Sequence, residues 1–226
     1  MHLGIIMDGN RRWAKQHGLS VMAGHEAGVR KVEEIISWCP DLGIKELTVY
    51  AFSTENFKRS PDEVGHLMNL FRKKFADFSK DERLKDLRIR VIGRISLLPA
   101  DLQKRIAELV EKTRGNVKKG TVNFALGYGG RTEILDMVRK VARQVKDGKL
   151  DAEDIDEKVV AENLYMVDEP DLIIRTGGAM RTSNFLPWQG AYSEWAFMDK
   201  MWPEISKEDV AKAIEDFKAR ERRFGR

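Results

Sequence analysis

The sequence predicts an α/β protein: one domain over residues 1–226, with a mostly parallel central sheet of about six strands flanked by helices. Three observations predict this class. Short apolar runs rich in β-branched residues alternate with longer amphipathic segments. Runs such as TVYAF and DLIIRT are apolar almost throughout, which suits strands that are buried on both faces. The chain of 226 residues is also long enough for one large core.

Each short apolar run is an expected strand and is followed by a longer amphipathic segment. The expected strands cover residues 3–7, 47–52, 88–92, 122–126, 172–175 and 195–198. The segments between them place apolar residues at helical spacing and predict helices over residues 24–38, 61–78, 100–117, 132–146, 157–165 and 207–220. The second helix opens at SPDE, where Ser60 is the expected N-cap, Pro61 the first helical residue and Glu63 the end of a capping box. The segments KDERLKD and VKDGKLDAEDIDEK are expected to be charged turns.

Composition restricts the classes of partner. The 40 Lys and Arg residues nearly balance 36 Asp and Glu residues, so the net charge of +4 favours anionic partners only weakly. No basic stripe with interleaved aromatic residues supports a nucleic-acid binder. The single cysteine, Cys39, predicts a buried thiol and a cytoplasmic protein. No signal peptide or membrane span is visible, so any contact with lipid is expected to be peripheral.

Four of the expected strands are followed by unusual polar segments. Asp8-Gly9-Asn10-Arg11-Arg12-Trp13 follows the first strand, FSTENFKR the second, GYGGR the fourth and RTGGAMRTSNFLPWQ the fifth. Parallel α/β sheets bind ligands beyond the carboxyl ends of their strands. We therefore expect these four segments to meet at one edge of the sheet.

Each segment also has a purely structural explanation. Asp8 could cap a helix that starts near Gly9, and GYGG could be a flexible turn. Arg175 and Arg181 could be surface charges, His25 an ordinary helix residue, and STEN a plain loop. Four such segments at one edge of a sheet favour a site over four separate coincidences.

The residue types restrict the chemistry of that site. The sequence has no GxxxxGK[ST] phosphate loop, no GxSxG elbow and no HExxH zinc helix. What remains is the Asp8 carboxylate, several guanidinium groups, and backbone amides at residues 9–10 and 177–178. Magnesium prefers one or two carboxylates together with phosphate oxygens, and arginine donates two parallel hydrogen bonds to phosphate. The set predicts a site for diphosphates, and two are expected because arginines come from both halves of the chain.

The helix after Ser60 carries large apolar residues that have two explanations. Val64, Leu67, Phe71 and Phe75 could be ordinary core, or part of this face could line a channel for an apolar tail. Burial of hydrocarbon is worth about 0.8 kcal/mol per methylene, so each five-carbon isoprene would contribute on the order of 4 kcal/mol. Diphosphate-binding groups beside an apolar groove describe a site for isoprenoid diphosphates.

Long motifs spread over nearly the whole chain resemble one known family. IIMDGNRRWAK, GHEAG, YAFSTENFKRSPDEV, YGGR, DLIIRTGGAMRTSNFLPWQGAYSEW, WPE and RERRFG are similar to the motifs of cis-prenyltransferases, the undecaprenyl diphosphate synthase family. The resemblance implies a homodimer of parallel-sheet α/β subunits. It also implies a Mg²⁺-dependent condensation of isopentenyl diphosphate with an allylic prenyl diphosphate, which gives a Z-polyprenyl diphosphate.

The resemblance implies roles for individual residues. Asp8 would bind magnesium and help to expel the allylic diphosphate, Glu194 would complete the metal site, and Asn56 would be the catalytic group associated with proton removal. Asparagine is a poor base, so Asn56 is expected to orient a diphosphate oxygen or a water that takes the proton. Glu194 precedes its expected strand, which puts it at the wrong edge of the sheet unless it acts across the dimer or the strand lies elsewhere. The implied substrate-binding residues are Gly9, Asn10, Arg11 (through its backbone amide), Arg12, Trp13, His25, Ser53, Thr54, Glu55, Phe57, Arg59, Arg175, Arg181, Thr182 and Ser183.

Departures from the family pattern leave an alternative open. Val21 stands where bacterial members carry an arginine, Gly127 where asparagine is usual, and Ala179-Met180 where a Glu-His pair is usual. The alternative is therefore a prenyltransferase of the same fold with a short product, non-head-to-tail coupling or a non-isoprenoid acceptor. A non-catalytic partner subunit is disfavoured because the aspartate motif is retained.

Overall fold

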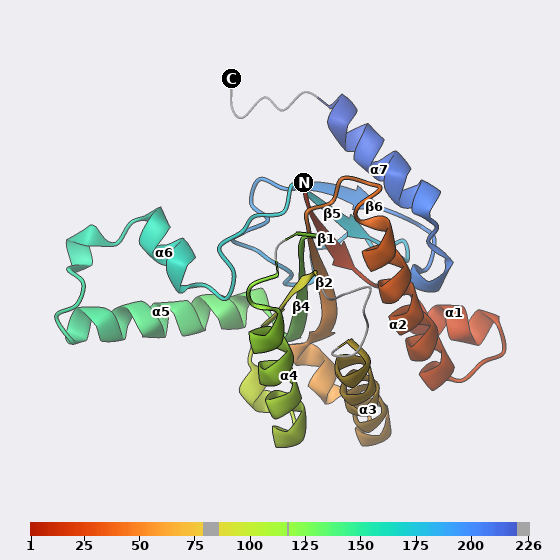
Figure 1. The fold of residues 1–226 in the computed structure, drawn as a ribbon, viewed down its shortest axis with the longest axis horizontal. Helices are drawn as coiled ribbons and strands as arrows, with labels where there is room; N and C mark the ends of the chain where they lie inside the picture. Colours follow the sequence, from red (N-terminus) through yellow and green to blue (C-terminus); the bar gives the residue numbers. More distant parts are fainter. Residues whose placement is uncertain (79–85, 117, 221–226) are drawn as a thin grey trace.

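The structure, a computed structural model, describes residues 1–78, 86–116 and 118–220. Its six strands form one sheet that is parallel throughout, in the order β3-β4-β2-β1-β5-β6 (Figure 1). The strands are β1 His2–Ile6, β2 Glu46–Ser53, β3 Arg88–Ile92, β4 Thr121–Tyr128, β5 Leu172–Arg175 and β6 Glu194–Phe197. The predicted α/β class is confirmed, and every predicted strand is present to within two residues at each end.

The helices are α1 Asn10–Gln16, α2 Val21–Trp38, α3 Pro61–Phe78, α4 Ala100–Thr113, α5 Gly130–Lys146, α6 Glu157–Asn163 and α7 Lys207–Ala219. They follow the predicted alternation: α3 has the predicted bounds, the other predicted helices differ at one or both ends, and α1 was not among the predicted helices. Short 3₁₀ helices cover Thr54–Lys58 (η1), Ile95–Leu97, Ala152–Asp154 and Trp202–Glu204. Helix α2 begins three residues earlier than predicted because Ser20 Oγ accepts a hydrogen bond from the Ala23 N–H at 3.2 Å.

Three predictions reach beyond the described residues. The predicted helix 100–117 ends at Thr113, and Val117 itself lies outside the described residues. Most of KDERLKD, and all of RERRFG after Arg220, also lie outside them.

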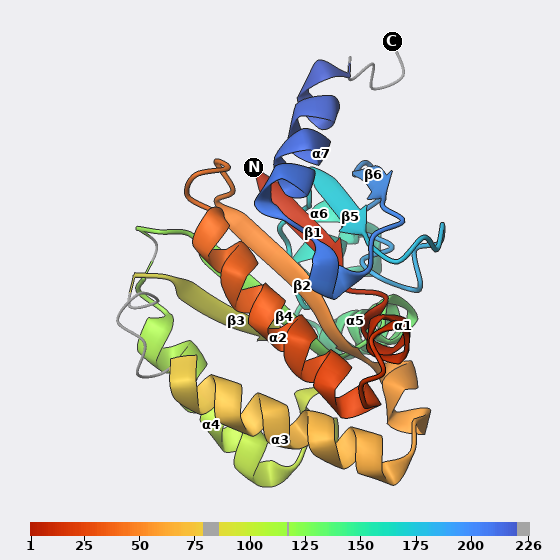
Figure 2. The ribbon, with the colours of Figure 1, turned by 90° about the vertical axis from the view of Figure 1, so that its right-hand side faces the viewer.

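Two layers of helices and loops cover the sheet. Helices α2, α3 and α4 lie across one face, where the main core joins strand residues such as Leu3 and Val49 to Ile35 and Leu102 from the helices (Figure 2). A smaller core on the other face includes Phe185 from a loop. Helices α5 and α6 extend away from the sheet (Figure 1). No helix in the described ranges is long and apolar enough to span a membrane.

The strand order places a crevice at the carboxyl end of β1. Strand β1 lies between β2 and β5, so the chain leaves it on one side and later returns on the other. In open parallel sheets, ligands bind beyond the strand ends at this kind of reversal. Asp8 follows β1 and Arg175 ends β5, so both lie at this crevice.

Candidate active site

Asp8 is held by two arginines. Its Oδ2 accepts from Arg175 Nη2 at 2.8 Å and its Oδ1 from Arg12 Nη2 at 3.2 Å. Helix α1 does begin beside it, but the N-cap residue is Gly9, with φ of 111° and no side-chain capping bond. The explanation of Asp8 as a helix cap is therefore wrong.

Arg175 is the buried centre of these contacts, with a relative exposure of 3%. Besides Asp8, its Nη1 donates to Ser183 Oγ at 2.6 Å and to the Arg181 carbonyl at 2.7 Å. One guanidinium group thus joins the end of β1, the end of β5 and the loop after β5. The explanation of Arg175 as a surface charge is wrong.

The loop after β5 has an unusual backbone. Ser183, Asn184 and Leu186 have φ of 50°, 63° and 47°, in the left-handed region that non-glycine residues rarely adopt. Asn184 holds the loop against the start of α5, because its carbonyl accepts from the Gly130 N–H at 2.8 Å. A Cβ on Gly130 would lie 2.0 Å from Pro187 Cδ. GYGG is therefore a packed support for this loop and not a flexible turn.

Asn56 is fixed by Ser53 at the end of β2. Asn56 Oδ1 accepts from the Ser53 N–H at 2.9 Å, and the Asn56 N–H donates to Ser53 Oγ at 3.2 Å. The remaining polar atom of the amide is Nδ2, which can only donate. This arrangement fits an orienting group and not a base.

His25 forms a buried contact between two helices. His25 Nε2 and Arg59 Nη1 each lie 2.9 Å from Glu63 Oε1. Burial lowers the pKa of His25, so the neutral ring donates to the carboxylate. Burial raises the pKa of Glu63, but the bond from His25 and the charges of Arg59 and Arg11 outweigh burial and lower it. His25 is thus not an ordinary helix residue.

The same contact corrects the predicted capping box of α3. Ser60 Oγ accepts from the Glu63 N–H at 3.4 Å as expected. The Glu63 side chain turns to His25 and Arg59 instead of the Ser60 backbone. The second half of the predicted capping box is wrong.

Two glycines of the GHEAG motif bring α1 against α2. A Cβ on Gly24 would lie 2.4 Å from the Asn10 carbonyl oxygen, and a Cβ on Gly28 would lie 2.4 Å from Asn10 Oδ1. Since real Cβ atoms do not approach so closely, a side chain at Gly24 would collide with the Asn10 backbone, and one at Gly28 would displace the Asn10 side chain. The close contact sets the position of the Asn10 side chain.

Two polar pockets meet at Asp8. The N-terminal pocket, of about 800 Å³, is lined by Met7, Asp8, Gly9, Asn10, Arg11, Arg12, Lys15, Leu19, Ser20, Val21, His25 and Arg59. The central pocket, of about 550 Å³, is lined by Ile6, Met7, Asp8, Tyr50, Ser53, Glu55, Asn56, Arg59, Arg175, Arg181, Ser183 and Asn184. The two share Met7, Asp8 and Arg59.

The charge of these pockets suits two anions. Their linings contain six cationic side chains and two carboxylates, Asp8 and Glu55. Burial raises the pKa of Glu55, but hydrogen bonds from its backbone, Thr54, Ser53 and Asn184 outweigh burial and lower it, so Glu55 stays charged. No cluster of three or more potential metal ligands occurs in the described ranges. A single carboxylate such as that of Asp8 suits a magnesium ion that takes its other ligands from substrate phosphates. It does not suit a metal site whose ligands all come from the protein.

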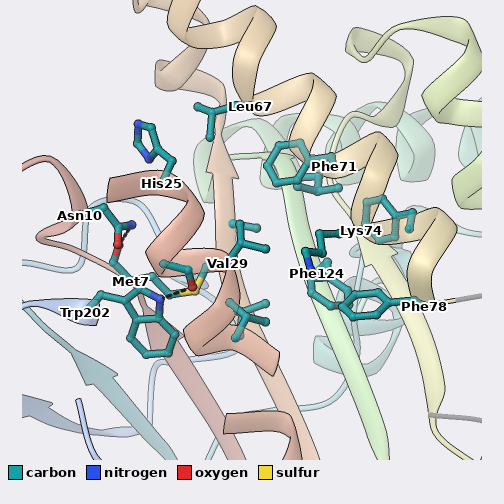
Figure 3. A pocket seen from close by; sticks show the side chains of 16 residues that line it. Met7, Asn10, His25, Val29, Leu67, Phe71, Lys74, Phe78, Phe124 and Trp202 are labelled. Atoms are coloured by element: carbon teal, nitrogen blue, oxygen red, sulfur yellow. Dashed lines mark hydrogen bonds between the residues drawn. The ribbon is translucent and has the colours of Figure 1, made fainter. Parts of the chain in front are cut away.

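An apolar pocket, here called the apolar channel, lies between α2 and α3 beside the N-terminal pocket (Figure 3). Its lining includes Val29 and Val32 from α2, Leu67 and Phe71 from α3, and Phe124 from β4. It shares Met7, Asn10 and His25 with the N-terminal pocket, but only Met7 with the central pocket. The volume is about 80 Å³, below the roughly 150 Å³ of a cavity that holds benzene, so the walls must separate to admit a chain of several isoprene units.

Some predicted residues do not line either polar pocket. Trp13 lies beside His17 with the two rings tilted and their centroids 4.5 Å apart, and Phe57 packs edge-on against Phe52. Thr54 donates to Glu55, and Thr182 supports the loop by accepting from the Phe185 N–H at 3.1 Å. The backbone amides of Gly177 and Gly178 donate to the carbonyls of Lys200 and Met198, so the prediction that they face a diphosphate is wrong.

Glu194 lies far along the sheet from Asp8. It is the first residue of β6 and pairs in register with Leu172, the first residue of β5, whereas Asp8 follows the last residue of β1. Its Oε2 accepts from Arg220 Nη1 at 2.9 Å. The two carboxylates therefore cannot share a metal within one chain, and joint ligation would need a second protomer.

The sequence did not single out four polar pocket residues: Lys15, Ser20, Tyr50 and Asn184. Lys15 lies four residues after Arg11 on α1, so helical spacing could have identified it. Asn184 stands next to predicted Ser183, and no feature of the sequence indicates its backbone conformation.

The fold and the site define a class of protein: an α/β protein with two adjoining polar pockets rich in cationic side chains, one of which shares its lining with an apolar pocket. The family model described as "Putative undecaprenyl diphosphate synthase" matches residues 6–225. The chain therefore belongs to this family, the cis-prenyltransferases, and is an enzyme of prenyl transfer.

Named relatives and a solved structure agree with this assignment. Tritrans,polycis-undecaprenyl-diphosphate synthases (geranylgeranyl-diphosphate specific) from Thermoplasma acidophilum and Pyrococcus horikoshii are 49% and 50% identical to this chain. They cover all of it, and it covers 88% and 86% of them. The structure of lavandulyl diphosphate synthase from Lavandula x intermedia with dimethylallyl diphosphate has a TM-score of 0.92 and 36% identity, over 100% of this chain and 98% of that one. The names of the relatives agree with condensation of isopentenyl and allylic diphosphates, and not with the alternative of non-standard coupling.

Proposed function

We propose that this enzyme extends geranylgeranyl diphosphate with isopentenyl diphosphate in a magnesium-dependent reaction that forms a Z double bond at each step. The starter is taken from the relatives, whose names specify geranylgeranyl diphosphate. The product would be a long Z-polyprenyl diphosphate.

The observation that carries this proposal is the unequal connection of the two polar pockets to the apolar channel. The N-terminal pocket shares Asn10 and His25 with the apolar channel, so it suits the allylic diphosphate, whose tail needs an apolar path. The central pocket has Arg175, Arg181 and Ser183 but no such path, so it suits isopentenyl diphosphate. The reacting carbons would meet near Met7, which lines all three spaces.

Asp8 is the proposed magnesium ligand, with diphosphate oxygens as its partners. Bound magnesium would stabilise the negative charge that gathers on the leaving diphosphate. Arg12 would donate to the same diphosphate, and Arg59 faces both pockets and would hold the two substrates at a fixed separation. Arg175 positions Asp8 and Ser183 through its buried hydrogen bonds.

Asn56 would act after the new bond forms. Its Nδ2 would donate to a diphosphate oxygen or water near C2 of the isopentenyl unit and orient it to accept the proton. Ser53 fixes the amide in this orientation. Asn56→Asp would place an anion beside a diphosphate, so it is expected to lower the activity more than Asn56→Gln does.

The active form is proposed to be a homodimer. Leu135 and Val138 lie three residues apart on α5 and are 53% and 51% exposed, an apolar surface that a second protomer could cover. A partner protomer would also be needed for Glu194 to approach Asp8. Sedimentation analysis of the protein and of Val138→Glu tests this arrangement.

Incubation with labelled isopentenyl diphosphate and allylic diphosphates of five to twenty carbons tests the function. We expect magnesium-dependent incorporation, with geranylgeranyl diphosphate the best starter, and loss of incorporation in Asp8→Ala. Coupled product in the absence of isopentenyl diphosphate, or undiminished activity of Asp8→Ala, would contradict the proposal.

A further inference from the structure

Lys15 differs from the other cations of the N-terminal pocket. The pocket is lined by four cationic side chains: Arg11, Arg12, Lys15 and Arg59. Each arginine has a carboxylate oxygen within 4.0 Å, from Asp8 for Arg12 and from Glu63 for the other two. Lys15 Nζ has no hydrogen bond or ion pair within the part of the chain that the structure describes. Its side chain is exposed on α1, so its charge is available to a ligand.

The N-terminal pocket has an inner and an outer end. Three residues of its lining also line the apolar channel and define the inner end: Met7, Asn10 and His25 (Figure 3). Four residues between the end of α1 and the start of α2 line neither the apolar channel nor the central pocket and define the outer end: Lys15, Leu19, Ser20 and Val21. Lys15 lies five residues after Asn10, about 7.5 Å along the axis of α1. It therefore stands at the end of the pocket that is remote from the apolar channel.

The two ends of the pocket orient a prenyl diphosphate. Because the hydrocarbon enters the apolar channel, the phosphate bonded to carbon belongs at the inner end, beside Asn10. The terminal phosphate then lies farther out, on the side of Lys15. A lysine side chain is flexible and ends in a compact charge with three rotatable donors, so Lys15 can turn to meet that phosphate. The arginines are held by carboxylates and are less free to do so.

We propose that Lys15 binds the terminal phosphate of the allylic substrate and thereby makes the N-terminal pocket select a prenyl diphosphate over a prenyl monophosphate. The inference rests on the proposed function, which places the allylic substrate in this pocket. A monophosphate held at the inner end has no group within reach of Lys15. The lysine therefore strengthens the binding of diphosphates only.

Calorimetric binding of two unreactive or slowly reacting ligands tests this selection. The ligands are geranylgeranyl thiodiphosphate, in which sulfur replaces the oxygen bonded to carbon, and geranylgeranyl monophosphate, each with magnesium. Lys15→Met should raise the Kd of the thiodiphosphate about tenfold and leave that of the monophosphate unchanged. Lys15→Arg keeps the charge and should bind both ligands as the parent does. Lys104→Met is the matched control, because Lys104 is an exposed lysine on α4 that lines none of the three pockets.

Steady-state kinetics and a relocated charge separate this contact from a general effect on the enzyme. A contact that is equally strong before and during the reaction changes KM and not kcat. Lys15→Met should therefore raise KM for geranylgeranyl diphosphate about tenfold, with little change in kcat or in KM for isopentenyl diphosphate. The rise should shrink at high salt, because the contact is exposed. Val21→Arg added to Lys15→Met returns a cation to the outer end and is expected to restore tight binding of the thiodiphosphate.

Two results would overturn the role of Lys15 and leave the proposed function intact. One is an equal Kd of the thiodiphosphate in Lys15→Met and the parent. The other is an equal weakening of thiodiphosphate and monophosphate in Lys15→Met, at the melting temperature of the parent. Failure of the unmodified enzyme to incorporate isopentenyl diphosphate would instead overturn the proposed function, because the binding measurements need no turnover.

Discussion

Replacement of Gly28 by alanine tests how the candidate active site is held together. Gly28 lies inside α2, and its added Cβ would meet Asn10 Oδ1 at 2.4 Å and Asn10 Cγ at 2.9 Å. Asn10 lies where the N-terminal pocket joins the apolar channel. The substitution is therefore expected to displace the Asn10 side chain from that junction.

The expected magnitude combines two opposing effects. Overpacking costs about 1–3 kcal/mol, while alanine in place of glycine inside a helix gains about 1 kcal/mol. The free energy of unfolding of Gly28→Ala should therefore be lower than that of the parent by roughly 0–2 kcal/mol. Gly65→Ala is the matched control, since Gly65 lies inside α3 with no atom within 4 Å of the added Cβ. Gly65→Ala should show only the stabilisation of about 1 kcal/mol from alanine in a helix, which would raise Tm by about 2–4 °C.

Thermal unfolding and steady-state kinetics separate the two variants. If Asn10 donates a hydrogen bond to the allylic diphosphate, Gly28→Ala loses that bond. A hydrogen bond to a charged group contributes about 1.5–3 kcal/mol, so kcat/KM for that substrate should fall by roughly 10- to 150-fold. Gly65→Ala should keep the parent kinetics. If Gly28→Ala matched Gly65→Ala in both stability and kinetics, the reasoning about Asn10 would be refuted.

Three further predictions concern the same region. Asp8→Asn should lower incorporation of isopentenyl diphosphate by about 100-fold or more. Chelation of magnesium should abolish incorporation reversibly in the parent enzyme. Equal activity of variant and parent would contradict the role of the carboxylate. Trp202→Phe removes a buried 2.8 Å hydrogen bond to the Gly28 carbonyl and should lower the free energy of unfolding by about 1–3 kcal/mol, measured by urea denaturation. In the folded protein the pKa of His25 is lowered from 6.5 and that of Glu63 from 4.5, so at acidic pH the unfolded chain binds more protons than the folded protein. Tm should therefore fall as the pH drops below about 6.5 and fall again below about 4.5. Part of the first fall should vanish in His25→Gln.

Periodicity was sufficient to predict the sheet and most helices. A run such as TVYAF has few alternatives to a buried strand, and the strand ends then determine which polar segments meet. The edge of the sheet where Asp8 and Arg175 approach each other could be predicted for this reason. Membership of the family likewise followed from long motifs.

Contacts between helices could not be predicted in the same way. The Glu63 side chain had a good local partner in the Ser60 backbone, but burial beside His25 favoured a distant one. The amides of Gly177 and Gly178 were predicted to be available, but carbonyls of a later segment accept from them. Such choices depend on which groups are buried together, and local sequence does not contain that information.

The central place of β1 has a consequence for biosynthesis. This strand contains residues 2–6, yet one of its two neighbours is β5, which ends at Arg175. At 5–20 residues per second, a ribosome needs on the order of 10–30 s to make the intervening chain. During that time the apolar first strand has an open hydrogen-bonding edge, which makes the nascent chain prone to aggregation and a client for chaperones. Fragments that end before β5 should therefore not fold, however completely they retain the N-terminal motif.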